Sequence, residues 1–279
     1  MTRYWRCGAF ELALDQPLIM GVLNVTPDSF SDGGRFDDPV AAVTHGEQLI
    51  AEGAAILDVG GESTRPGASE VPAAAEIARV RPVVLRFAHE PVPVSVDTRH
   101  AEVAIACIEA GASIINDVSG FSDRAMIDVA AGCDAGVVVM HMRGEPKTMQ
   151  GEPRYDDVVR EVGGYLVAQA TTLEAAGVER SRIALDPGIG FGKTLEHNLE
   201  LLRHLPELAA LGFPLVVGVS RKRFIGTITG VEEPASRLSG SLAAACWAVS
   251  HGADVVRVHD VASTCEAVAV TAAIAGRPE

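Results

Sequence analysis

Eight short apolar runs, rich in β-branched residues, alternate with helical segments, and this alternation constrains the fold more than any other feature of the chain. The runs cover residues 18–25, 55–61, 92–98, 113–119, 136–142, 183–187, 214–220 and 254–260. The segments between them, such as 39–52, 73–88, 101–110 and 155–176, are rich in Ala, Leu and Glu with helical spacing. Continuously apolar strands joined by helices predict a parallel sheet that helices cover on both faces.

The number of strand-then-helix units indicates how this sheet closes. Eight units in 279 residues predict an α/β fold of the (β/α)₈ TIM-barrel class, for which about 250 residues is typical. A doubly wound open sheet is the alternative for the same alternation. Glycines at positions 53, 111, 177, 212 and 252 follow helical segments and are expected to end them in a left-handed conformation. No linker divides the chain, so we expect one domain over residues 1–279, with residues 1–17 as a short N-terminal cap beneath the barrel.

Composition excludes several classes of partner. The formal net charge of −14 argues against nucleic acid and against an anionic membrane surface, because both need a basic face. The five cysteines are odd in number and form no C-x-x-C pair, which favours reduced thiols over a disulfide framework or a zinc site. No apolar run reaches membrane-spanning length, and the first residues lack the apolar core of a signal peptide. We therefore expect a cytoplasmic protein whose ligands are small molecules.

Each predicted strand delivers a polar or ionisable residue at its carboxyl end, where TIM barrels carry their chemistry. In chain order these residues are Asn24, Glu62, Asp97, Asn116, His141, Asp186, Lys222 and, in the last strand, Arg257 with His259. One polar residue near a strand end is usually a solvated terminus. Eight strands that deliver such a residue to the same rim predict a binding site.

Two sets of these residues differ in the ligand chemistry they suit. Asp97, Asn116, Asp186 and Lys222 offer planar donors and acceptors for a flat heterocycle, although a structural ion pair is the alternative for Asp186 with Lys222. A cationic set comprises Arg65, Arg257 and His259, and the last strand leads directly into a helix whose N-terminus favours an oxyanion or a phosphate. Asn24 and the Asp-rich loop after it can present oxygens to Mg²⁺ shared with phosphate groups.

Residues 186–194 look like a phosphate-binding loop but fail its pattern. A loop of the form G-x-x-x-x-G-K-T needs glycine five positions before Gly192, where this chain has Pro187. The same residues give G-x-G-x-G and not the G-x-G-x-x-G of dinucleotide-binding proteins. We therefore expect neither nucleotide motif here.

Seven segments of the chain together closely resemble the dihydropteroate synthase family. They are residues 21–34 (GVLNVTPDSFSDGG), 58–67 (DVGGESTRPG), 95–98 (SVDT), 115–119 (INDVS), 186–191 (DPGIGF), 218–222 (GVSRK) and 257–260 (RVHD). The resemblance runs from about residue 17 to the C-terminus, and the first, second and seventh segments are highly specific in combination.

The resemblance implies a (β/α)₈ barrel that joins 4-aminobenzoate (p-aminobenzoate) to (7,8-dihydropterin-6-yl)methyl diphosphate, giving 7,8-dihydropteroate and diphosphate. Its positions for the pterin are matched by Asp97, Asn116, Asp186 and Lys222. Those for the diphosphate are matched by Asn24, Thr64, Arg257 and His259, with Asn24 also the ligand of a Mg²⁺ cofactor. Those for p-aminobenzoate, and for sulfonamides, are matched by Phe30, Thr64, Pro66, Phe191 and Lys222.

The same resemblance implies that the loops at residues 26–36 and 62–68 close over the site, and we expect Asp28, Asp32, Arg65 and Lys222 to be catalytic. Because the electron-rich pterin stabilises positive charge on its methylene carbon, we predict an SN1-like substitution in which diphosphate leaves first. The family also implies a homodimer through late helices, with which the apolar segment 238–249 is compatible. Arg223 stands where many bacterial relatives carry a Ser that touches the p-aminobenzoate carboxylate, so a backbone N–H and Arg223 itself are both open as the anchor.

Two other functions fit part of the sequence. A methyltetrahydrofolate-binding methyltransferase barrel shares the fold and the pterin, but it works beside a cobalamin module for which this chain has no room. A non-catalytic pterin-binding paralogue also fits the pterin residues, although the intact first and second loops argue against it. A turnover assay with p-aminobenzoate separates that paralogue from an enzyme.

Overall fold

The predicted barrel is present in the computed structural model of the chain, which describes residues 3–26, 39–63, 71–144, 149, 151 and 153–276. Eight parallel strands follow one another in the order β8-β7-β6-β5-β4-β3-β10-β9, and a bridge between Leu185 and Leu215 joins the two ends of this order. The sheet therefore closes, which excludes the doubly wound alternative. The strands are β3 (Leu18–Asn24), β4 (Ile56–Gly60), β5 (Val94–Asp97), β6 (Ile114–Asp117), β7 (Gly136–Met140), β8 (Ile183–Asp186), β9 (Val216–Gly218) and β10 (Val255–Val258).

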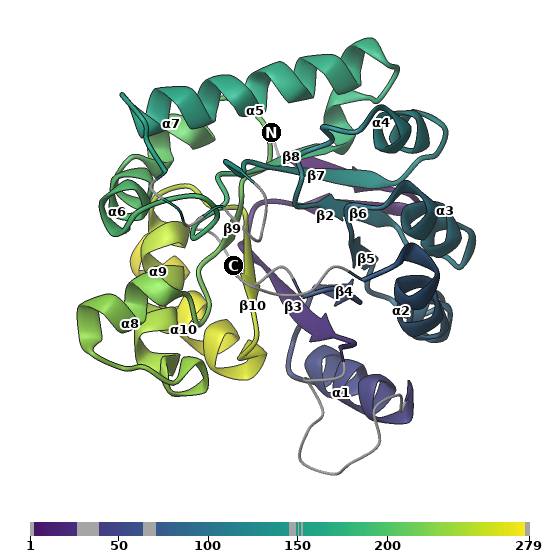
Figure 1. The fold of residues 1–279 in the computed structure, drawn as a ribbon. Coiled ribbons are helices and arrows are strands. Elements are labelled where there is room, and N and C mark those ends of the chain that lie inside the picture. The colour runs from purple at the N-terminus through teal and green to yellow at the C-terminus, as the bar shows by residue number, and fades with distance from the viewer. Residues whose placement is uncertain are drawn as a thin grey trace.

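Helices follow the strands and form the outer layer of the barrel (Figure 1). They are α1 (Pro39–Ala51), α2 (Ala73–Phe87), α3 (Ala101–Glu109), α4 (Arg124–Ala131), α5 (Val158–Ala175), α6 (Leu195–Arg203), α7 (Leu205–Ala209), α8 (Arg223–Thr229), α9 (Leu238–Ser250) and α10 (Val261–Ile274), with short 3₁₀ turns η2 (Arg180–Arg182) and η3 (Pro234–Ser236). The five glycines predicted to end helices all have positive φ, between 80° and 106°. The strands are shorter than the apolar runs because residues at one or both ends of each run lie outside the sheet, and those at the carboxyl ends form the rim.

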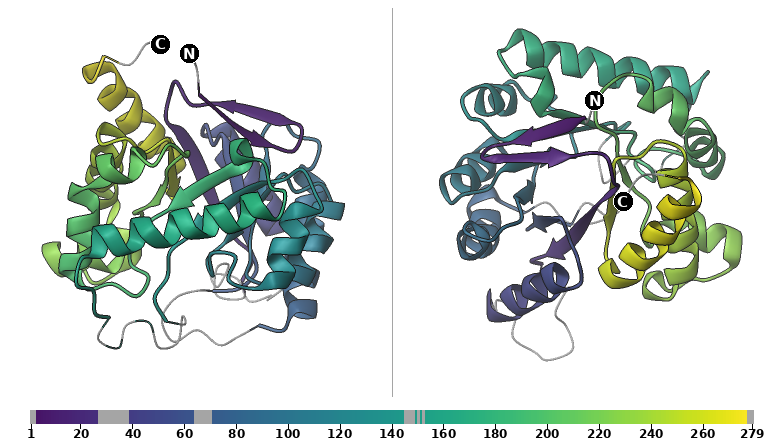
Figure 2. Two further views of the ribbon diagram at one scale, coloured as in Figure 1. Left: turned by 90° about the horizontal axis from the view of Figure 1, so that it is seen from above. Right: turned by 180° about the vertical axis from the view of Figure 1, so that it is seen from behind.

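The N-terminal cap is an antiparallel hairpin of β1 (Tyr4–Cys7) and β2 (Phe10–Ala13) that lies across one end of the barrel (Figure 2). Trp5 is fully buried and donates its indole N–H to the carbonyl of Arg182 at 2.9 Å. Trp5 and Cys7 complete an apolar cluster with interior residues of the strands. Among the described residues, this cluster fills the amino end of the barrel, so we look for a ligand site at the carboxyl end.

Side chains alternate between the two faces of each strand, and this phase decides which polar residues face the interior. The interior cluster includes Met20, Ile56, Ile114, Val138, Ala184, Val216 and Val255. Their neighbours along the strands, such as Leu57, Ile115 and Leu185, belong to a larger core between the sheet and the helices. In the part of the chain that the structure describes, no helix combines the length and the apolar character needed to span a bilayer.

Candidate active site

The interior of the barrel changes from apolar to polar towards the carboxyl ends of the strands. Four polar residues each stand two positions after an interior apolar residue and so share its inward phase: Asp58, Asn116, Asp186 and Arg257. The strand register places Asn24 opposite Gly60, Gly60 opposite Asp97, and Asp97 opposite Asn116. A Cβ at position 60 would lie in ordinary contact with both neighbours, 3.7 Å from Asp97 Oδ2 and 3.9 Å from Asn24 Oδ1. The side chains of Asn24 and Asp97 therefore lie on either side of Gly60 at the rim.

A buried ion cluster occupies the polar layer. Arg257 donates through Nε to Asp58 Oδ2 at 2.6 Å and through Nη2 to Asp97 Oδ2 at 2.7 Å. Asn116 donates its amide N–H₂ group to both oxygens of Asp58 at 3.3 Å. The sequence assigned Arg257 to the diphosphate and Asp97 to the pterin, so one guanidinium joins the two expected sets.

Asp58 is the site residue that reasoning from strand ends misses. It is fully buried inside β4 and holds both Arg257 and Asn116. A signal for it exists in the sequence, because a carboxylate within a five-residue apolar strand is costly unless it is paired. Asp58 lies in the middle of its strand, whereas the predicted site residues are those at the strand ends.

Two carboxylates share one guanidinium in this cluster, which leaves an excess negative charge when all three groups are ionised. Burial raises the pKa of Asp97 to about 7; the Arg257 charge opposes this shift and the Asp58 charge adds to it. Ser95 pairs with Asp58 in the strand register, and its buried hydroxyl has no hydrogen-bond partner among the described residues. The layer therefore keeps charge and hydrogen-bonding capacity that a donor-rich ligand would satisfy.

Asp186 and Lys222 lie on the β8 and β9 side of the rim. Asp186 Oδ1 accepts the Gly188 N–H at 2.7 Å, and burial raises the pKa of Asp186. The Lys222 ammonium lies 4.3 Å from the centre of the Phe191 ring, and burial lowers the pKa of Lys222 to about 8, although the Asp186 charge opposes this shift. None of the ion pairs between described residues joins Asp186 to Lys222, so the purely structural ion pair is not formed.

The pH dependence of kcat/KM should reflect these two titrations. A pterin N–H needs the ionised form of Asp97, so kcat/KM is expected to rise as the pH passes about 7. It should fall as Lys222 loses its proton near pH 8. Asp58→Asn removes a like charge that raises the pKa of Asp97, so the acid limb should move to lower pH while the alkaline limb stays. Initial rates at low substrate between pH 5 and 10 would check this, and an acid limb unmoved in Asp58→Asn would contradict it.

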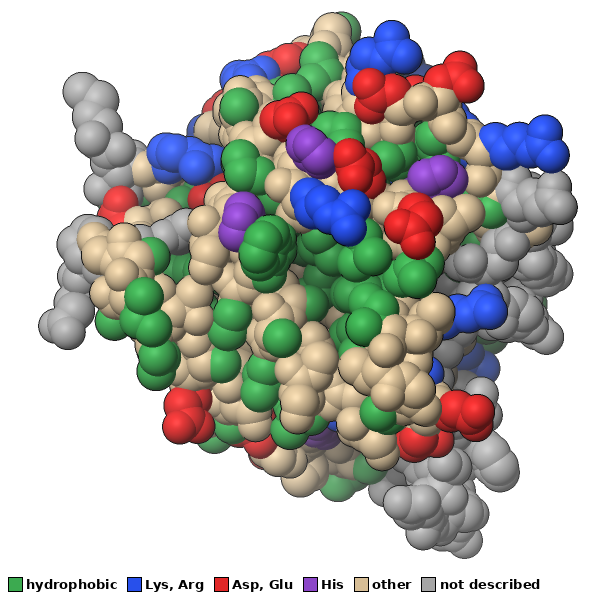
Figure 3. All heavy atoms as spheres, turned by 90° about the vertical axis from the view of Figure 1, so that its left-hand side faces the viewer, with side chains coloured by type: hydrophobic (Ala, Val, Ile, Leu, Met, Phe, Trp, Pro, Cys, Tyr) green, Lys and Arg blue, Asp and Glu red, His purple; other side chains and the backbone are tan. Residues whose placement is uncertain are grey.

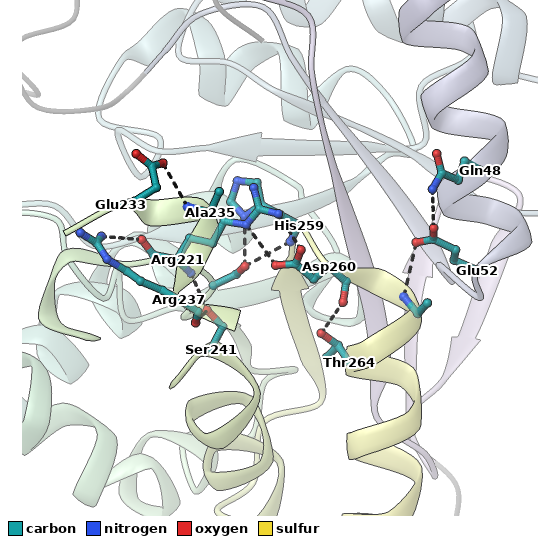
Figure 4. A network of polar contacts seen from close by, with 12 residues as sticks. Gln48, Glu52, Arg221, Glu233, Ala235, Arg237, Ser241, His259, Asp260 and Thr264 are labelled. Atoms are coloured by element: carbon teal, nitrogen blue, oxygen red, sulfur yellow. Dashed lines mark hydrogen bonds and ion pairs between the residues drawn. The ribbon is translucent and has the colours of Figure 1, made fainter. Parts of the chain in front are cut away.

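His259, expected at the diphosphate, is held by Ser220 in the loop after β9 (Figure 4). Its backbone N–H donates to Ser220 Oγ at 3.2 Å, and its Nδ1 lies 3.0 Å from the same hydroxyl. Between Ser220 and Lys222, Arg221 has a positive φ of 58°. Its guanidinium pairs with Asp260 at 3.0 and 2.5 Å, which fixes the turn that carries both neighbours.

The N-terminus of α10 is only partly available for an anion. It begins two residues after His259, as the sequence predicts for the last unit. The Ala262 N–H in its first turn already faces the Glu52 carboxylate at 3.4 Å (Figure 4). The side chains of Arg257 and His259 are therefore better placed to carry an anion site than the helix end.

A charged network lies where β4 leaves the barrel. Arg99 donates to both oxygens of Glu62 at 3.0 and 3.2 Å, and His100 Nδ1 lies 2.8 Å from Glu76 Oε2. Glu76 is fully buried, its Oε1 has no partner among the described residues, and burial raises its pKa. Glu62, Glu76 and His100 are close enough to hold a metal ion, with ligand atoms within 4.8 Å of one another. The Arg99 guanidinium already takes up both Glu62 oxygens, which does not suit a cation.

Several assigned residues lie outside the described residues: Asp28, Phe30, Asp32, Thr64, Arg65 and Pro66. Their roles stay predictions, as does closure of the two loops that contain them. Arg223 is the first residue of α8, directly after Lys222, and is exposed. Its part in holding a carboxylate also stays a prediction.

The chain matches the family described as "Pterin binding enzyme" over residues 20–259. It is 51% identical over 272 residues to a dihydropteroate synthase of Neisseria meningitidis, with 96% of each chain covered. It is 49% identical over 264 residues to the dihydropteroate synthase of Escherichia coli, covering 94% of this chain and 93% of that protein.

Solved structures agree with these relatives. A dihydropteroate synthase of Xanthomonas albilineans with 4-aminobenzoic acid superposes with a TM-score of 0.94 at 46% identity, covering 100% of both chains. A Burkholderia cenocepacia dihydropteroate synthase complexed with 7,8-dihydropteroate superposes with a TM-score of 0.90 at 44% identity, covering 99% of this chain and 98% of that one. The family match covers most of the barrel, about half of the residues are identical to those of relatives over nearly the full length, and the fold is shared. The chain therefore belongs to the pterin-binding enzymes and, among them, to the dihydropteroate synthase family.

Proposed function

We propose that this chain joins (7,8-dihydropterin-6-yl)methyl diphosphate to p-aminobenzoate and releases 7,8-dihydropteroate and diphosphate. The observation that carries the proposal is the buried cluster in which Arg257 bridges Asp58 and Asp97. The carboxylates of this cluster offer acceptors for the amino and ring N–H groups of a pterin. Arg257, which contacts both of them, offers a cation for the leaving group. The relatives solved with 4-aminobenzoic acid and with 7,8-dihydropteroate support the same assignment.

The pterin ring lies, in this proposal, between Asp97 and Asn116 on one side and Asp186 with Lys222 on the other. As the bond to diphosphate breaks, positive charge develops on the pterin methylene, and the carboxylates of Asp97 and Asp186 stabilise it. A pterin donor that takes over Asp97 releases one edge of Arg257, which can then turn to the departing diphosphate beside His259. The amine of p-aminobenzoate, held over Phe191 and Lys222, then forms a C–N bond with the methylene carbon, and its proton passes to water.

Asn24 fits a Mg²⁺ site better than the Glu62 network does. Mg²⁺ is usually held by one or two protein oxygens together with water and substrate phosphates, and Asn24 offers one amide oxygen at the rim. When bound, the ion would neutralise charge on the diphosphate. This assignment is checked by Asn24→Ala, which should weaken the dependence of turnover on Mg²⁺ while Kd for a pterin without phosphates stays the same.

Turnover by the purified chain tests the proposed function. With both substrates and Mg²⁺ we expect 7,8-dihydropteroate, identified by mass, with one diphosphate released for each product molecule. Binding of pterin without product would instead identify a non-catalytic paralogue. Methyl transfer from methyltetrahydrofolate to a corrinoid, without product from p-aminobenzoate, would identify the methyltransferase.

We further propose that the chain forms a homodimer through its late helices. Hydrophobic side chains gather on the face that carries α6, α8 and α9 (Figure 3). Trp247 on α9 is 46% exposed, stacks on His251 with ring centres 3.9 Å apart and donates its indole N–H to the Leu202 carbonyl of α6. Light scattering should give twice the chain mass for the wild type and the mass of one chain for Trp247→Glu. A dimer that persists in Trp247→Glu would remove α9 from the interface.

The proposal also places the whole activity in one domain. Every described residue of the candidate site lies on the strands of one barrel or on the loops directly after them. The five cysteines are free thiols, two of them buried, which is consistent with a reducing compartment such as the cytoplasm.

A further inference from the structure

Lys193 is a buried lysine that the proposed reaction does not use. Its side chain is 3% exposed, and no described carboxylate lies within ion-pair distance of it. Its ammonium donates instead to the carbonyls of Gly188 at 2.9 Å, Phe191 at 3.0 Å and His141 at 3.2 Å. It also lies 3.0 Å from His141 Nδ1. Burial and the Lys193 charge lower the pKa of His141 to about 3, so its ring is neutral. Because an ammonium only donates, Nδ1 of His141 accepts in this contact. Lysine is rare in the chain, at positions 147, 193 and 222 only.

The acceptors around Lys193 belong to two loops pressed together at the rim. One loop follows β7 at His141, and the other follows β8 over residues 187–194. A Cβ on Gly188 would lie 1.9 Å from the His141 carbonyl oxygen, and one on Gly192 would lie 2.2 Å from the Arg143 carbonyl oxygen. Both glycines have positive φ, of 65° and 60°. The backbones of the two loops are therefore in close contact, and the carbonyl oxygens of Gly188, Phe191 and His141 all point to the Lys193 Nζ within 3.2 Å. Converging carbonyl dipoles repel one another, and a cation among them offsets that repulsion.

The loop after β8 contacts the side chain of Lys222. Its Gly188 N–H binds Asp186, and its Phe191 ring lies under the Lys222 ammonium at 4.3 Å. A Cβ on Gly190 would lie 3.3 Å from Cδ of Lys222, so the backbone there touches the stem of that side chain. A displacement of this loop would therefore move Phe191 and Lys222 together.

We propose that Lys193 is a positioning residue whose ammonium holds the carbonyls of the β7 and β8 loops together, so that Phe191 and Lys222 present a preformed pocket to p-aminobenzoate. The inference rests on the proposed function. Lys193 touches neither substrate and acts through the loop. Three of the four pterin residues, Asp97, Asn116 and Asp186, lie in the strands β5, β6 and β8 and not in the loop. Lys222 serves both substrates, so binding of the pterin should depend on Lys193 less than binding of p-aminobenzoate does.

Lys193→Met tests this role, with Arg182→Met as a matched control. Arg182 is also a buried cation bound to carbonyls, those of Ala135 and Ala130 at 2.8 Å, but it lies beside Trp5 at the amino end of the barrel. Both variants should lower the melting temperature. Only Lys193→Met should raise KM for p-aminobenzoate, by about tenfold or more, with a change in pterin Kd below about threefold. Lys193→Gln, which keeps an N–H₂ donor, should fall between Lys193→Met and the wild type.

An unchanged KM for p-aminobenzoate in Lys193→Met, or the same increase in Arg182→Met, would overturn the inference. Absence of turnover by the wild type would overturn the proposed function instead. If Lys193→Met does not fold, ¹⁵N-lysine spectra of the wild type decide. Burial lowers the pKa of Lys193 to about 7, so the spectra are recorded at pH 6. We expect an ammonium signal protected from solvent exchange that Lys222→Arg leaves in place, and its absence at this pH would overturn the role of Lys193.

Discussion

Arg257→Met is expected to lower kcat about 10²–10³-fold, the usual cost of removing one group that stabilises a developing anion. The Arg257 side chain is 21% exposed, binds both Asp58 and Asp97 and belongs to a residue two positions before His259. In the proposed reaction it is the cation that serves both the pterin residues and the leaving group. The variant should also lose about 3–5 kcal/mol of folding free energy, because Asp58 and Asp97 are left buried without their partner. Steady-state kinetics and denaturant unfolding measure the two effects separately.

A second substitution separates these two roles of Arg257. Asp58→Asn in the Arg257→Met background removes one uncompensated carboxylate, so stability should recover in part while kcat stays low. Arg257→Lys should retain more activity than Arg257→Met, but an ammonium cannot bind Asp58 and Asp97 as the guanidinium fork does. Recovery of kcat along with stability in the double variant would mean that Arg257 matters only for the fold.

Asp186→Asn should weaken pterin binding by about 10²–10³-fold, since it replaces charged hydrogen bonds, each contributing about 1.5–3 kcal/mol, with weaker or mismatched ones. Asparagine keeps the shape of the side chain and can still accept the Gly188 N–H, so the loop after β8 should stay in place. The negative charge opposite the developing cation is lost, and kcat should fall as well. Isothermal titration with a pterin and single-turnover rates would measure both effects.

Asp117→Asn is the matched control for Asp186→Asn. Asp117 is also a buried acid at the carboxyl end of a strand, but it accepts N–H groups of Ser119 and Phe121 in its own loop. Its loss should lower stability and leave pterin Kd close to that of the wild type. Wild-type pterin Kd and turnover in Asp186→Asn would show that the pterin is bound elsewhere.

The sequence predicts the barrel well because its evidence is local and repeated. A run of β-branched residues indicates each strand. A glycine indicates each of five helix ends, and the structure confirms its positive φ. The polar rim follows from the same reasoning, since a closed parallel sheet brings every carboxyl end to one face. The sequence predicts where the N-terminal cap lies, beneath the barrel. It does not predict that the cap is a hairpin, because that form depends on the packing of Trp5 against interior residues of the strands.

The sequence does not reveal how the rim residues pair, because pairing depends on contacts across the barrel. Arg257 and Asp58 are 199 positions apart, and only closure of the sheet brings them together. Lys193 lies in the segment 186–194, whose glycine spacing fits neither nucleotide motif. Its burial among carbonyls follows from the packing of the β8 loop against the β7 loop, which no spacing in the sequence encodes.

Release of diphosphate from the pterin substrate, followed with and without p-aminobenzoate and Mg²⁺, tests the central claim most directly. If the buried charges make diphosphate leave first, the enzyme mixed with the pterin substrate and Mg²⁺, without p-aminobenzoate, should give a single-turnover burst of diphosphate. Addition of p-aminobenzoate to the same mixture should give sustained turnover. Asp186→Asn and Arg257→Met should each reduce the burst. Diphosphate release that occurs only with p-aminobenzoate, at a rate set by its concentration, would contradict the account and indicate direct displacement.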